Sequence, residues 1–388
     1  MTNGPVRGYA HVLKEDLVSR DLLFLGTEFG LWVSLDGGRK WMQYKGGDLP
    51  SVPVMDLAIH PRDHDLVIAT HGRGIWIVDD ITPLRALTPE MIAKDVAVLE
   101  TRPSTQGISG PGGWADGDAT YVGPNRPDEA VITYYQKKRH IFGDLTIQVL
   151  GEDGKLLGTV PTSKRRGLNR VHWSMRLKPP RVPAAATGAF AAAIGPRFLP
   201  GTYTVRLTKD KSVYSAALKV VSDPRAKHSR QGREAQFALS MKLYSLLGDM
   251  TYAVDRINAV RRALDARGAK LSPGDPLSKE LRRASDQVEA FRKKIVATKE
   301  GGAITGEERL REFLADLYGS VVGYEGLPSR TQEERAESLA RELAEVVSAF
   351  DAWVAKELPT VNASIAKGRL EPVKPLTRDQ WQKNGGQE

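Results

Sequence analysis

The stretch LLFLGTEFGLWVSLDGG at residues 22–38 recurs in outline as LVIATHGRGIWIVDDIT at residues 66–82. The two copies begin 44 residues apart, and apolar residues, a turn glycine and a tryptophan stay in phase between them. A repeat of roughly 40–45 residues built from short strands is the length of one β-propeller blade. The sequence therefore predicts about two blades within residues 1–82. The matched pairs are Leu22 and Leu66, Gly30 and Gly74, Leu31 and Ile75, Trp32 and Trp76, Val33 and Ile77, and Asp36 and Asp80.

The first copy runs into an S-x-D-x-G-x-x-W pattern, called an Asp-box, formed by Ser34, Asp36, Gly38 and Trp41. An aspartate in such a hairpin accepts N–H bonds across its own turn, a glycine supplies positive φ, and the tryptophan covers the turn. Lys40 stands where a small hydroxyl residue is common, which weakens the match slightly. We therefore expect these four residues to be structural, and Asp36 not to be catalytic.

Three stretches carry a resemblance to a known family: TEFGLWVSLDGG at 27–38, HPRD at 60–63 and ATHGRGIWIVDD at 69–80. They resemble the last blades of bacterial sortilin-like (Vps10-type) Asp-box proteins, a BNR-repeat β-propeller family often labelled glycosyl hydrolase or sialidase-like. The likeness continues through NRVHWSMR at 169–176, PGTYTVRL at 200–207 and VSDPR at 221–225. It implies the C-terminal part of a longer, extracytoplasmic protein that binds a peptide or a glycan.

Composition indicates a multidomain globular chain. The 388 residues are 41% hydrophobic and 27% charged. Cysteine is absent, which rules out disulfides and thiolate chemistry and is compatible with either the cytoplasm or the periplasm. No apolar run approaches the length of a membrane-spanning helix, and MTNGPVRGYAHVLKED lacks the apolar stretch of a signal peptide. We expect no membrane span and no export signal on this chain, and its location stays open.

The net charge of +9 raises the possibility of nucleic-acid binding. The basic runs are short and widely spaced: Lys137-Lys138-Arg139, Lys164-Arg165-Arg166, Arg261-Arg262 and Lys293-Lys294. No recognisable RNA- or DNA-binding module surrounds them, so solvated surface is the favoured interpretation. Nucleic-acid binding is the alternative, and it predicts an affinity that falls steeply with salt.

Downstream of the blades, proline and glycine predict a linker at 83–128, and short alternating strands then predict an immunoglobulin-like β-sandwich at 129–222. Trp173 and Tyr203 are expected in its core, and residues 184–195, rich in alanine and glycine, in a loose loop. The predicted strands are 130–135, 145–150, 155–160, 171–177, 202–208 and 215–221.

The hydrophobic period becomes helical after residue 223. Apolar residues from Leu239 to Leu264 recur at three- and four-residue steps, and further amphipathic runs follow at 277–298, 305–322 and 331–358, the last with Thr331-Gln332-Glu333-Glu334 as a capping box. We predict an antiparallel helical bundle at 223–366 and a disordered tail at 367–388, with coiled-coil dimerisation as the alternative. The fold class is thus multidomain, β plus α: a partial propeller, a sandwich and a helical bundle.

The search for chemistry yields no catalytic residue, no metal site and no cofactor site. His60, Asp63, His64 and His71 cluster in sequence, but the first three read as a polar turn between strands. Glycoside hydrolysis needs two facing carboxylates, and about two blades supply only an arc of a propeller's central wall. The carboxylates available for that alternative are Glu28, Asp56, Asp79 and Asp80.

The function predicted is therefore a non-catalytic binding and assembly module of a sortilin-like Asp-box propeller protein. Arg73, between two glycines, is the most function-like residue, and with Glu28 and His71 it is a predicted ligand contact. Fewer than about three repeats seldom stand alone, so residues 1–82 need a partner surface. Upstream blades, another chain, a second copy and the sandwich all stay open. The alternative function is part of a glycoside hydrolase whose site upstream blades complete.

Overall fold

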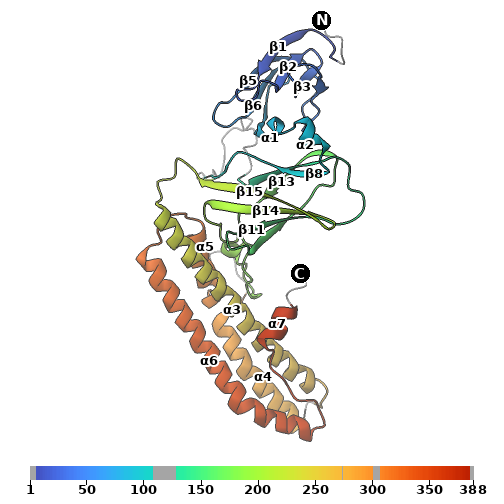
Figure 1. Cartoon of the computed structure of the whole chain (residues 1–388). Helices are drawn as coiled ribbons and strands as arrows, with labels where there is room; N and C mark the ends of the chain where they lie inside the picture. The colour runs from blue at the N-terminus through green and yellow to red at the C-terminus, as the bar shows by residue number, and fades with distance from the viewer. Residues whose placement is uncertain (1–5, 108–127, 273, 300–305, 385–388) are drawn as a thin grey trace. The chain divides into compact units, whose positions relative to one another are not determined.

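The computed structural model describes residues 6–107, 128–272, 274–299 and 306–384. The chain divides into two compact units, the first made of Met1–Met175 and Pro200–Ala226, the second of Arg176–Leu199 and Lys227–Glu388. The first unit is built from β-sheets and the second from helices, so the class is β plus α (Figure 1). Among the described residues, no helix is both long enough and apolar enough to cross a bilayer.

Two small antiparallel sheets form the N-terminal part of the first unit. One has the order β1-β2-β3-β4 and the other β5-β6-β7. Their facing sides share one apolar core that includes Phe24, Leu31, Ile59 and Ile68. The strands are β1 (Ala10–Glu15), β2 (Leu23–Thr27), β3 (Gly30–Ser34), β4 (Met42–Gln43), β5 (Val54–Ile59), β6 (Leu66–Thr70) and β7 (Ile75–Val78).

The sequence repeat is visible in the strand pairing. Strands β1 and β5 start 44 residues apart, and each carries a register shift at the same place, between Ala10 and Val12 and between Val54 and Asp56. Strands β3 and β7 keep that offset, but the pairing makes Leu66 the counterpart of Leu23. The predicted match of Leu22 with Leu66 is therefore wrong by one residue, because one residue is lost before β6 and one is gained in the hairpin after it.

Two further sheets complete the first unit. One has the order β13-β10-β8 and the other β12-β11-β14-β15-β9. Their buried side chains include Ile132, Tyr134, Ile147 and Leu207, which occupy alternate strand positions. The strands are β8 (Val96–Leu99), β9 (Ser104–Gln106), β10 (Ala130–Gln136), β11 (Leu145–Leu150), β12 (Leu156–Val160), β13 (Gly167–Trp173), β14 (Gly201–Lys209) and β15 (Ser212–Ser222).

Several predicted strands coincide with observed ones, and β11 spans the predicted 145–150. Strand β13 ends four residues before its predicted end at 177, because Met175 has a φ of 55° that breaks an extended backbone. Trp173 and Tyr203 form a T-shaped pair, with Trp173 buried. The predicted linker at 83–128 contains all but the first residue of α1 (Thr82–Arg85), together with α2 (Pro89–Ala93), β8 and β9. Its residues 108–127 lie outside the described part of the chain.

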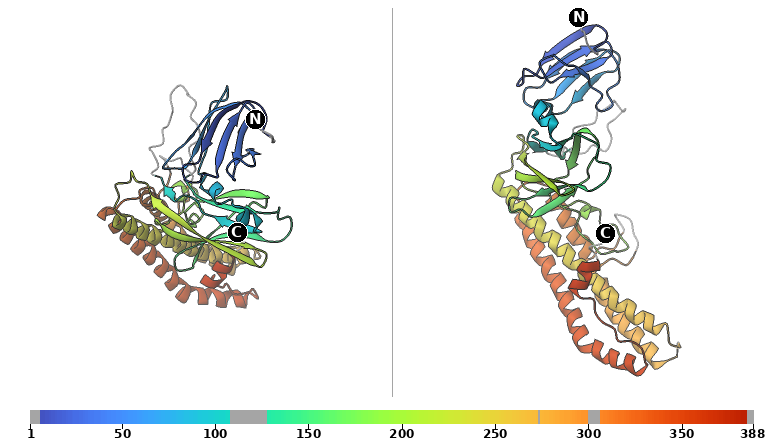
Figure 2. Two further views of the ribbon diagram at one scale, coloured as in Figure 1. Left: turned by 45° about the horizontal axis from the view of Figure 1, so that its top comes forward. Right: turned by 45° about the vertical axis from the view of Figure 1, so that its right-hand side comes forward.

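The second unit contains long helices packed side by side (Figure 2). Their shared core includes Leu243, Ile257, Val288, Leu314 and Leu339. The helices are α3 (Arg230–Gly268), α4 (Pro276–Ile295), α5 (Leu310–Val322), α6 (Arg330–Lys367) and α7 (Arg378–Asn384).

Helix α6 differs from its prediction at both ends. Its capping box uses Ser329, whose Oγ accepts the Gln332 N–H at 3.2 Å, and not Thr331. The helix also continues through Pro359 to Lys367, because Val361 and Ile365 are buried in the core on the far side of the proline. Helix α7 lies within the predicted disordered tail, where Trp381 Nε1 donates to Asp255 Oδ2 at 2.8 Å.

Residues 176–199, which include the predicted loose loop, belong to the helical unit. Arg311 Nε donates to the Pro183 carbonyl at 2.7 Å, and Tyr318 Oη donates to the Ile194 carbonyl at 2.7 Å. A Cβ at Gly319 would meet the Ala191 carbonyl oxygen at 2.8 Å, so α5 needs a glycine where this segment crosses it. The alanines and glycines of this segment permit close contact with α5. The prediction of a loose loop from the same residues is therefore not how the segment packs.

Candidate functional site

The predicted ligand contacts lie on two equivalent hairpins. Glu28 is in the β2–β3 hairpin and accepts the Tyr9 N–H at 3.1 Å, while His71 and Arg73 are exposed in the β6–β7 hairpin. In both hairpins a threonine Oγ1 donates to a glycine carbonyl, Thr27 to Gly30 and Thr70 to Gly74. The repeat thus places Glu28, His71 and Arg73 at the same end of their respective sheets. Their role as ligand contacts stays a prediction.

The S-x-D-x-G-x-x-W segment forms a compact turn after β3. Ser34 Oγ donates to Asp36 Oδ1 at 2.9 Å and accepts the Gly38 N–H at 2.8 Å. The Lys40 N–H donates to Asp36 Oδ1 at 2.8 Å, and this bond is the main cause that lowers the pKa of Asp36 below its ordinary value. Gly38 has a φ of 88°, and Trp41 packs against the cluster of Val6, Leu25 and Trp32. These bonds occupy the Asp36 carboxylate with the turn itself.

The four carboxylates of the hydrolase alternative have different surroundings. Asp80 is buried, and its carboxylate accepts the N–H groups of Thr82 and Arg102 at 3.1 Å each. Asp79 and Asp80 follow β7, whereas Glu28 precedes β3, so they lie at opposite ends of equivalent strands. Five strand residues span about 16 Å, beyond the roughly 5–9.5 Å that separates paired glycosidase carboxylates. This spacing disfavours pairing Glu28 with Asp79 or Asp80. Asp56, on β5, accepts the Leu57 N–H.

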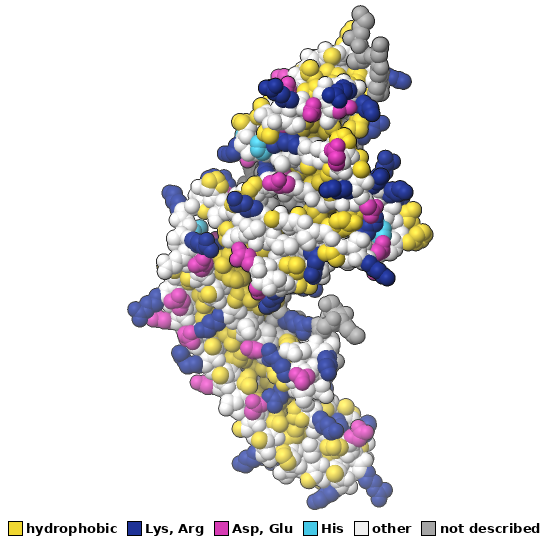
Figure 3. All heavy atoms as spheres, in the orientation of Figure 1, with side chains coloured by type: hydrophobic (Ala, Val, Ile, Leu, Met, Phe, Trp, Pro, Cys, Tyr) yellow, Lys and Arg dark blue, Asp and Glu magenta, His cyan; other side chains and the backbone are white. Residues whose placement is uncertain are grey.

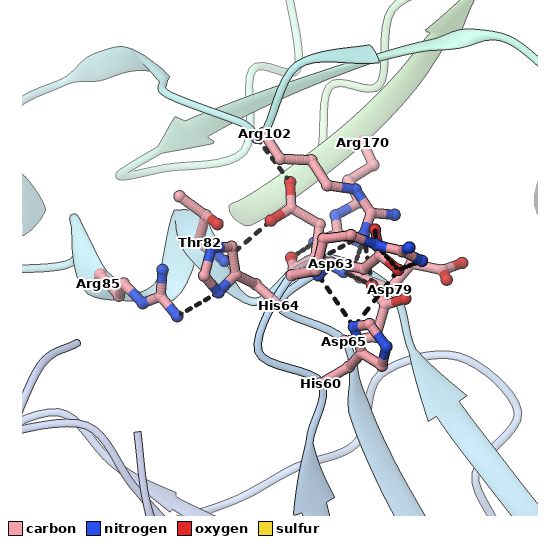
Figure 4. Close-up of polar contacts among 11 residues, drawn as sticks. His60, Asp63, His64, Asp65, Asp79, Thr82, Arg85, Arg102 and Arg170 are labelled. Carbon is pink, nitrogen blue, oxygen red and sulfur yellow. Dashed lines mark hydrogen bonds and ion pairs between the residues drawn. The ribbon is translucent and has the colours of Figure 1, made fainter. Parts of the chain in front are cut away.

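The predicted polar turn at 60–64 is part of a hydrogen-bonded joint within the first unit (Figure 4). Arg102 Nη1 donates to Asp65 Oδ1 at 2.7 Å and also to the Asp63 carbonyl. Arg170, on β13, donates to the carbonyls of Asp79 and Asp80 just after β7. Arg170 from β13 and Arg102 from the β8–β9 connection thereby hold the segments that border β5, β6 and β7.

A second part of the joint links the two N-terminal sheets. Arg85 Nε and Nη2 donate to the Asp16 carboxylate at 2.8 and 2.9 Å. Arg85 Nη2 also lies 3.2 Å from His64 Nδ1 (Figure 4). Since arginine has no acceptor, His64 accepts through that nitrogen. His64 has a φ of 56°, an uncommon conformation for a residue with a side chain. In the described part of the chain, no group of three or more His, Asp or Glu is placed to hold a metal.

The repeat identifies an exposed sheet face that the sequence analysis did not single out. In the β1–β4 sheet, the face that carries Phe24, Leu31 and Val33 packs on the β5–β7 sheet. We call this side of the β1–β4 sheet its front face and the opposite side its back face. The side of the β5–β7 sheet that carries the counterparts of Phe24, Leu31 and Val33 is likewise its front face. The β5–β7 sheet presents its back face to that contact, through Leu57, Ile59, Leu66 and Ile68.

The front face of the β5–β7 sheet is open. The strand pairing makes Val67, Ile75 and Ile77 the counterparts of Phe24, Leu31 and Val33. Leu31 and Val33 are 1% and 6% exposed, whereas Ile75 and Ile77 are 72% and 60% exposed. Equivalent apolar side chains therefore have a partner sheet in the first copy and water in the second.

The sequence contains a signal for the open front face but none for the arginines of the polar joint. The apolar residues of the open front face are in the repeat itself, as the pairs Leu31/Ile75 and Val33/Ile77, but only the pairing shows which is covered. Arg85, Arg102 and Arg170 carry no local signal, because their partners are as far as 91 residues away in sequence. Over the face shown in Figure 3, basic and acidic side chains are interspersed. The absence of nucleic-acid binding stays a prediction.

No protein-family model matches the chain, and no curated protein matches it. Among solved structures it is similar to PorZ, an essential bacterial surface component of the type-IX secretion system of Porphyromonas gingivalis, at 16% identity and a TM-score of 0.19. That match covers 55% of this chain and 22% of PorZ. The extracellular domain of BT4673 from B. thetaiotaomicron matches at 10% identity over 56% of this chain and 26% of that one, with a TM-score of 0.16. The chain thus spans about a quarter of these structures, and such TM-scores establish no shared fold.

Proposed function

We propose that this chain is a non-catalytic assembly module of an Asp-box propeller protein, and that the front face of its β5–β7 sheet receives a further sheet of the same repeat. The proposal takes the β1–β4 and β5–β7 sheets as two propeller blades and the later sheets as an immunoglobulin-like sandwich. The observation that carries it is the exposure of Ile75 and Ile77, whose counterparts Leu31 and Val33 are buried between sheets.

The internal contact between the two sheets supplies the geometry. A front face of Phe24, Leu31 and Val33 there meets a back face of Leu57, Ile59 and Ile68. By the same offsets, the back face of the β1–β4 sheet carries Leu13, Leu25 and Trp32, and Leu13 is 60% exposed. Burying each exposed isoleucine contributes about 1.5–3 kcal/mol to the free energy of association. The loss of translational and rotational freedom on association costs at least about 4 kcal/mol in total. A second copy of the chain is therefore expected to bind weakly, front to back.

The back face of the β1–β4 sheet and the hairpins provide the other proposed contacts. Val6 and Trp41 cover Leu25 and Trp32, which leaves Leu13 as the accessible part of the back face. Glu28, His71 and Arg73 are the proposed contacts for a peptide or glycan at the hairpin end of the blades. The polar joint of Arg85, Arg102 and Arg170 supports a scaffold role, because it ties the blades to the neighbouring sheets.

The test is sedimentation velocity of the purified chain from about 1 μM to about 1 mM, a range that reports weak association. The front variant is Ile75→Thr with Ile77→Thr, and the back variant is Leu13→Thr; threonine keeps β propensity in both. We expect the native chain to associate, each variant alone to stay monomeric, and an equimolar mixture to stop at dimers, because only one front–back contact remains. The matched control is Leu156→Thr with Val213→Thr, exposed strand residues outside both faces.

Either of two results would contradict this proposal. One is a native chain that stays monomeric over the whole range. The other is association of the front variant as strong as that of the native chain, which would place the contact elsewhere.

A further inference from the structure

The loop between β10 and β11 combines exposed apolar side chains with a dense set of cations. It reads KKRHIFGD at residues 137–144. Ile141 is 66% exposed and Phe142 is 86% exposed. Single exposed apolar residues are ordinary on protein surfaces. An adjacent isoleucine and phenylalanine at a loop tip that follows three consecutive cations are a different feature, and the proposed assembly role does not use them.

Hydrogen bonds bring two other basic segments to this loop. The His140 N–H donates to the Lys164 carbonyl at 3.0 Å, and Lys164 Nζ donates to the Gly143 carbonyl at 2.7 Å. At the β14–β15 turn, the Asp210 N–H donates to the Asp144 carbonyl at 3.0 Å. The Asp144 N–H in turn donates to Asp210 Oδ1 at 3.2 Å. The loop, residues 161–166 and the β14–β15 turn therefore meet at one end of the two later sheets, and we call this group the basic tip.

Cations outnumber carboxylates at the basic tip. Lys164 Nζ bonds to a carbonyl oxygen, so this bond does not neutralise its charge. Among the described residues of the basic tip, Lys209 is the cation that a carboxylate neutralises at close range, because Asp95 Oδ2 lies 2.7 Å from its Nζ. Lys137, Lys138 and Arg139 are exposed. The cations are Lys137, Lys138, Arg139, Lys164, Arg165, Arg166, Lys209 and Lys211, and the carboxylates are Asp95, Asp144 and Asp210.

We propose that the basic tip docks the chain on the surface of an anionic lipid bilayer. Apolar side chains that enter the headgroup region and cations that pair with anionic lipids are the two components of peripheral membrane binding. Ile141 and Phe142 supply the first component, and the exposed lysines and arginines supply the second. A polyanion such as RNA would engage the cations alike, but it would gain little from an exposed isoleucine.

The experiment is co-sedimentation of the full chain with vesicles of phosphatidylcholine that contain roughly a quarter phosphatidylserine, at physiological ionic strength. Vesicles of phosphatidylcholine alone are the lipid control. Ile141→Ser with Phe142→Ser is expected to weaken binding by roughly tenfold or more, since the apolar insertion is lost. Lys137→Gln, Lys138→Gln and Arg139→Gln together are expected to weaken it by roughly a hundredfold.

The matched control variant is Phe190→Ser. Phe190 is 89% exposed and has no lysine or arginine within five residues, so its loss is expected to leave vesicle binding unchanged. All the substituted side chains are exposed, and thermal unfolding checks that each variant keeps the native fold.

Three outcomes overturn the proposal. The first is no binding of the native chain to the anionic vesicles. The second is equal binding to the neutral vesicles. The third is a serine variant of Ile141 and Phe142 that binds the anionic vesicles and an RNA oligonucleotide as tightly as the native chain does, which would make the basic tip a site for polyanions.

Discussion

The ion pair of Asp16 with Arg85 is a buried contact that contributes to the stability of the first unit. Asp16 is 4% exposed, and both carboxylate oxygens accept bonds from Arg85. Burial by itself raises the pKa of Asp16, but the Arg85 bonds and the N–H groups of Ser19 and Val18 outweigh it and hold the pKa below its ordinary value. The pair joins β1 to α1 across 69 residues of sequence.

We predict that Asp16→Asn destabilises the first unit by about 3 kcal/mol at neutral pH, because it leaves the arginine charge buried without a counterion. A carboxyl whose folded pKa is lowered stabilises the fold above its unfolded pKa of about 3.9. That contribution is lost as pH falls through the lower, folded pKa. The difference in unfolding free energy between native chain and variant is thus expected to shrink on acidification below about pH 4.

Urea unfolding followed by circular dichroism at several pH values measures this difference. The control is Asp63→Asn, which removes an exposed pair with Arg62 and is expected to cost under about 1 kcal/mol. If the two variants were equally stable at neutral pH, the Asp16 pair would have no special structural role.

At this scale the sequence predicts only what lies within one turn. Ser34, Asp36, Gly38 and Trp41 all lie within residues 34–41, and the geometry of their turn follows from residue type. Asp16 and Arg85 meet because β1 and α1 pack together. That contact is a property of the tertiary structure, and the sequence around neither residue predicts it.

Among the elements, helix α6 makes the sharpest prediction. It continues for eight residues beyond Pro359, which cannot donate to the Ala355 carbonyl. We expect Pro359→Ala to stabilise the helical unit by about 1–2 kcal/mol, less than the roughly 3 kcal/mol cost of an interior proline, because the surrounding packing is already adapted to the proline. Thermal unfolding monitored at 222 nm, the helical signal, measures the change.

Lys356→Ala, an exposed neighbour on the same helix, is the control and is expected to change stability by less than about 0.5 kcal/mol. A destabilised Pro359→Ala variant would show instead that the core requires the proline.

Strands and helices were predicted well where the hydrophobic period is long or the turn residues are strong. Strand β11 and most of α4 fall at their predicted places. The misses have tertiary causes. Strand β8 lies in the stretch whose prolines predict a linker, yet β10 pairs with it. Helix α6 passes a proline because Val361 and Ile365 are buried in the core. The single-residue shift between β2 and β6 is likewise invisible until their pairing is known.

At the scale of the whole molecule, the helical unit is completed by residues 176–199. Arg233 Nη2 donates to the Arg197 carbonyl at 2.6 Å, and Tyr318 and Arg311 also bond to this segment. We predict that a fragment of residues 227–388 melts about 5 °C or more below the helical unit of the full chain, because these buried donors lose their partners.

A synthetic peptide of residues 176–199, added in excess, is expected to restore part of that loss by mass action. A peptide with Ile194 and Ala191 each replaced by Asp is the control. The aspartate at position 191 would clash with the close approach at Gly319, so this peptide should restore nothing. Equal melting of fragment and full chain would contradict the prediction and make the segment a passive connection.

The division into a β unit and a helical unit could be predicted from the change of hydrophobic period near residue 223. The assignment of 176–199 could not, because its alanines and glycines have no period of their own. Their packing depends on Gly319 and Tyr318, which come more than a hundred residues later in the sequence.

That separation has a consequence for synthesis on the ribosome. Ile194 leaves the exit tunnel 124 residues before Tyr318, the residue whose hydroxyl its carbonyl accepts. At about 5–20 residues per second, the nascent segment waits between roughly 6 and 25 s for that partner. Strands β14 and β15 emerge directly after it and pair early, so the segment is then a loop closed at both ends by the finished β unit. The helical unit can complete its core only by folding onto a loop that the β unit already anchors.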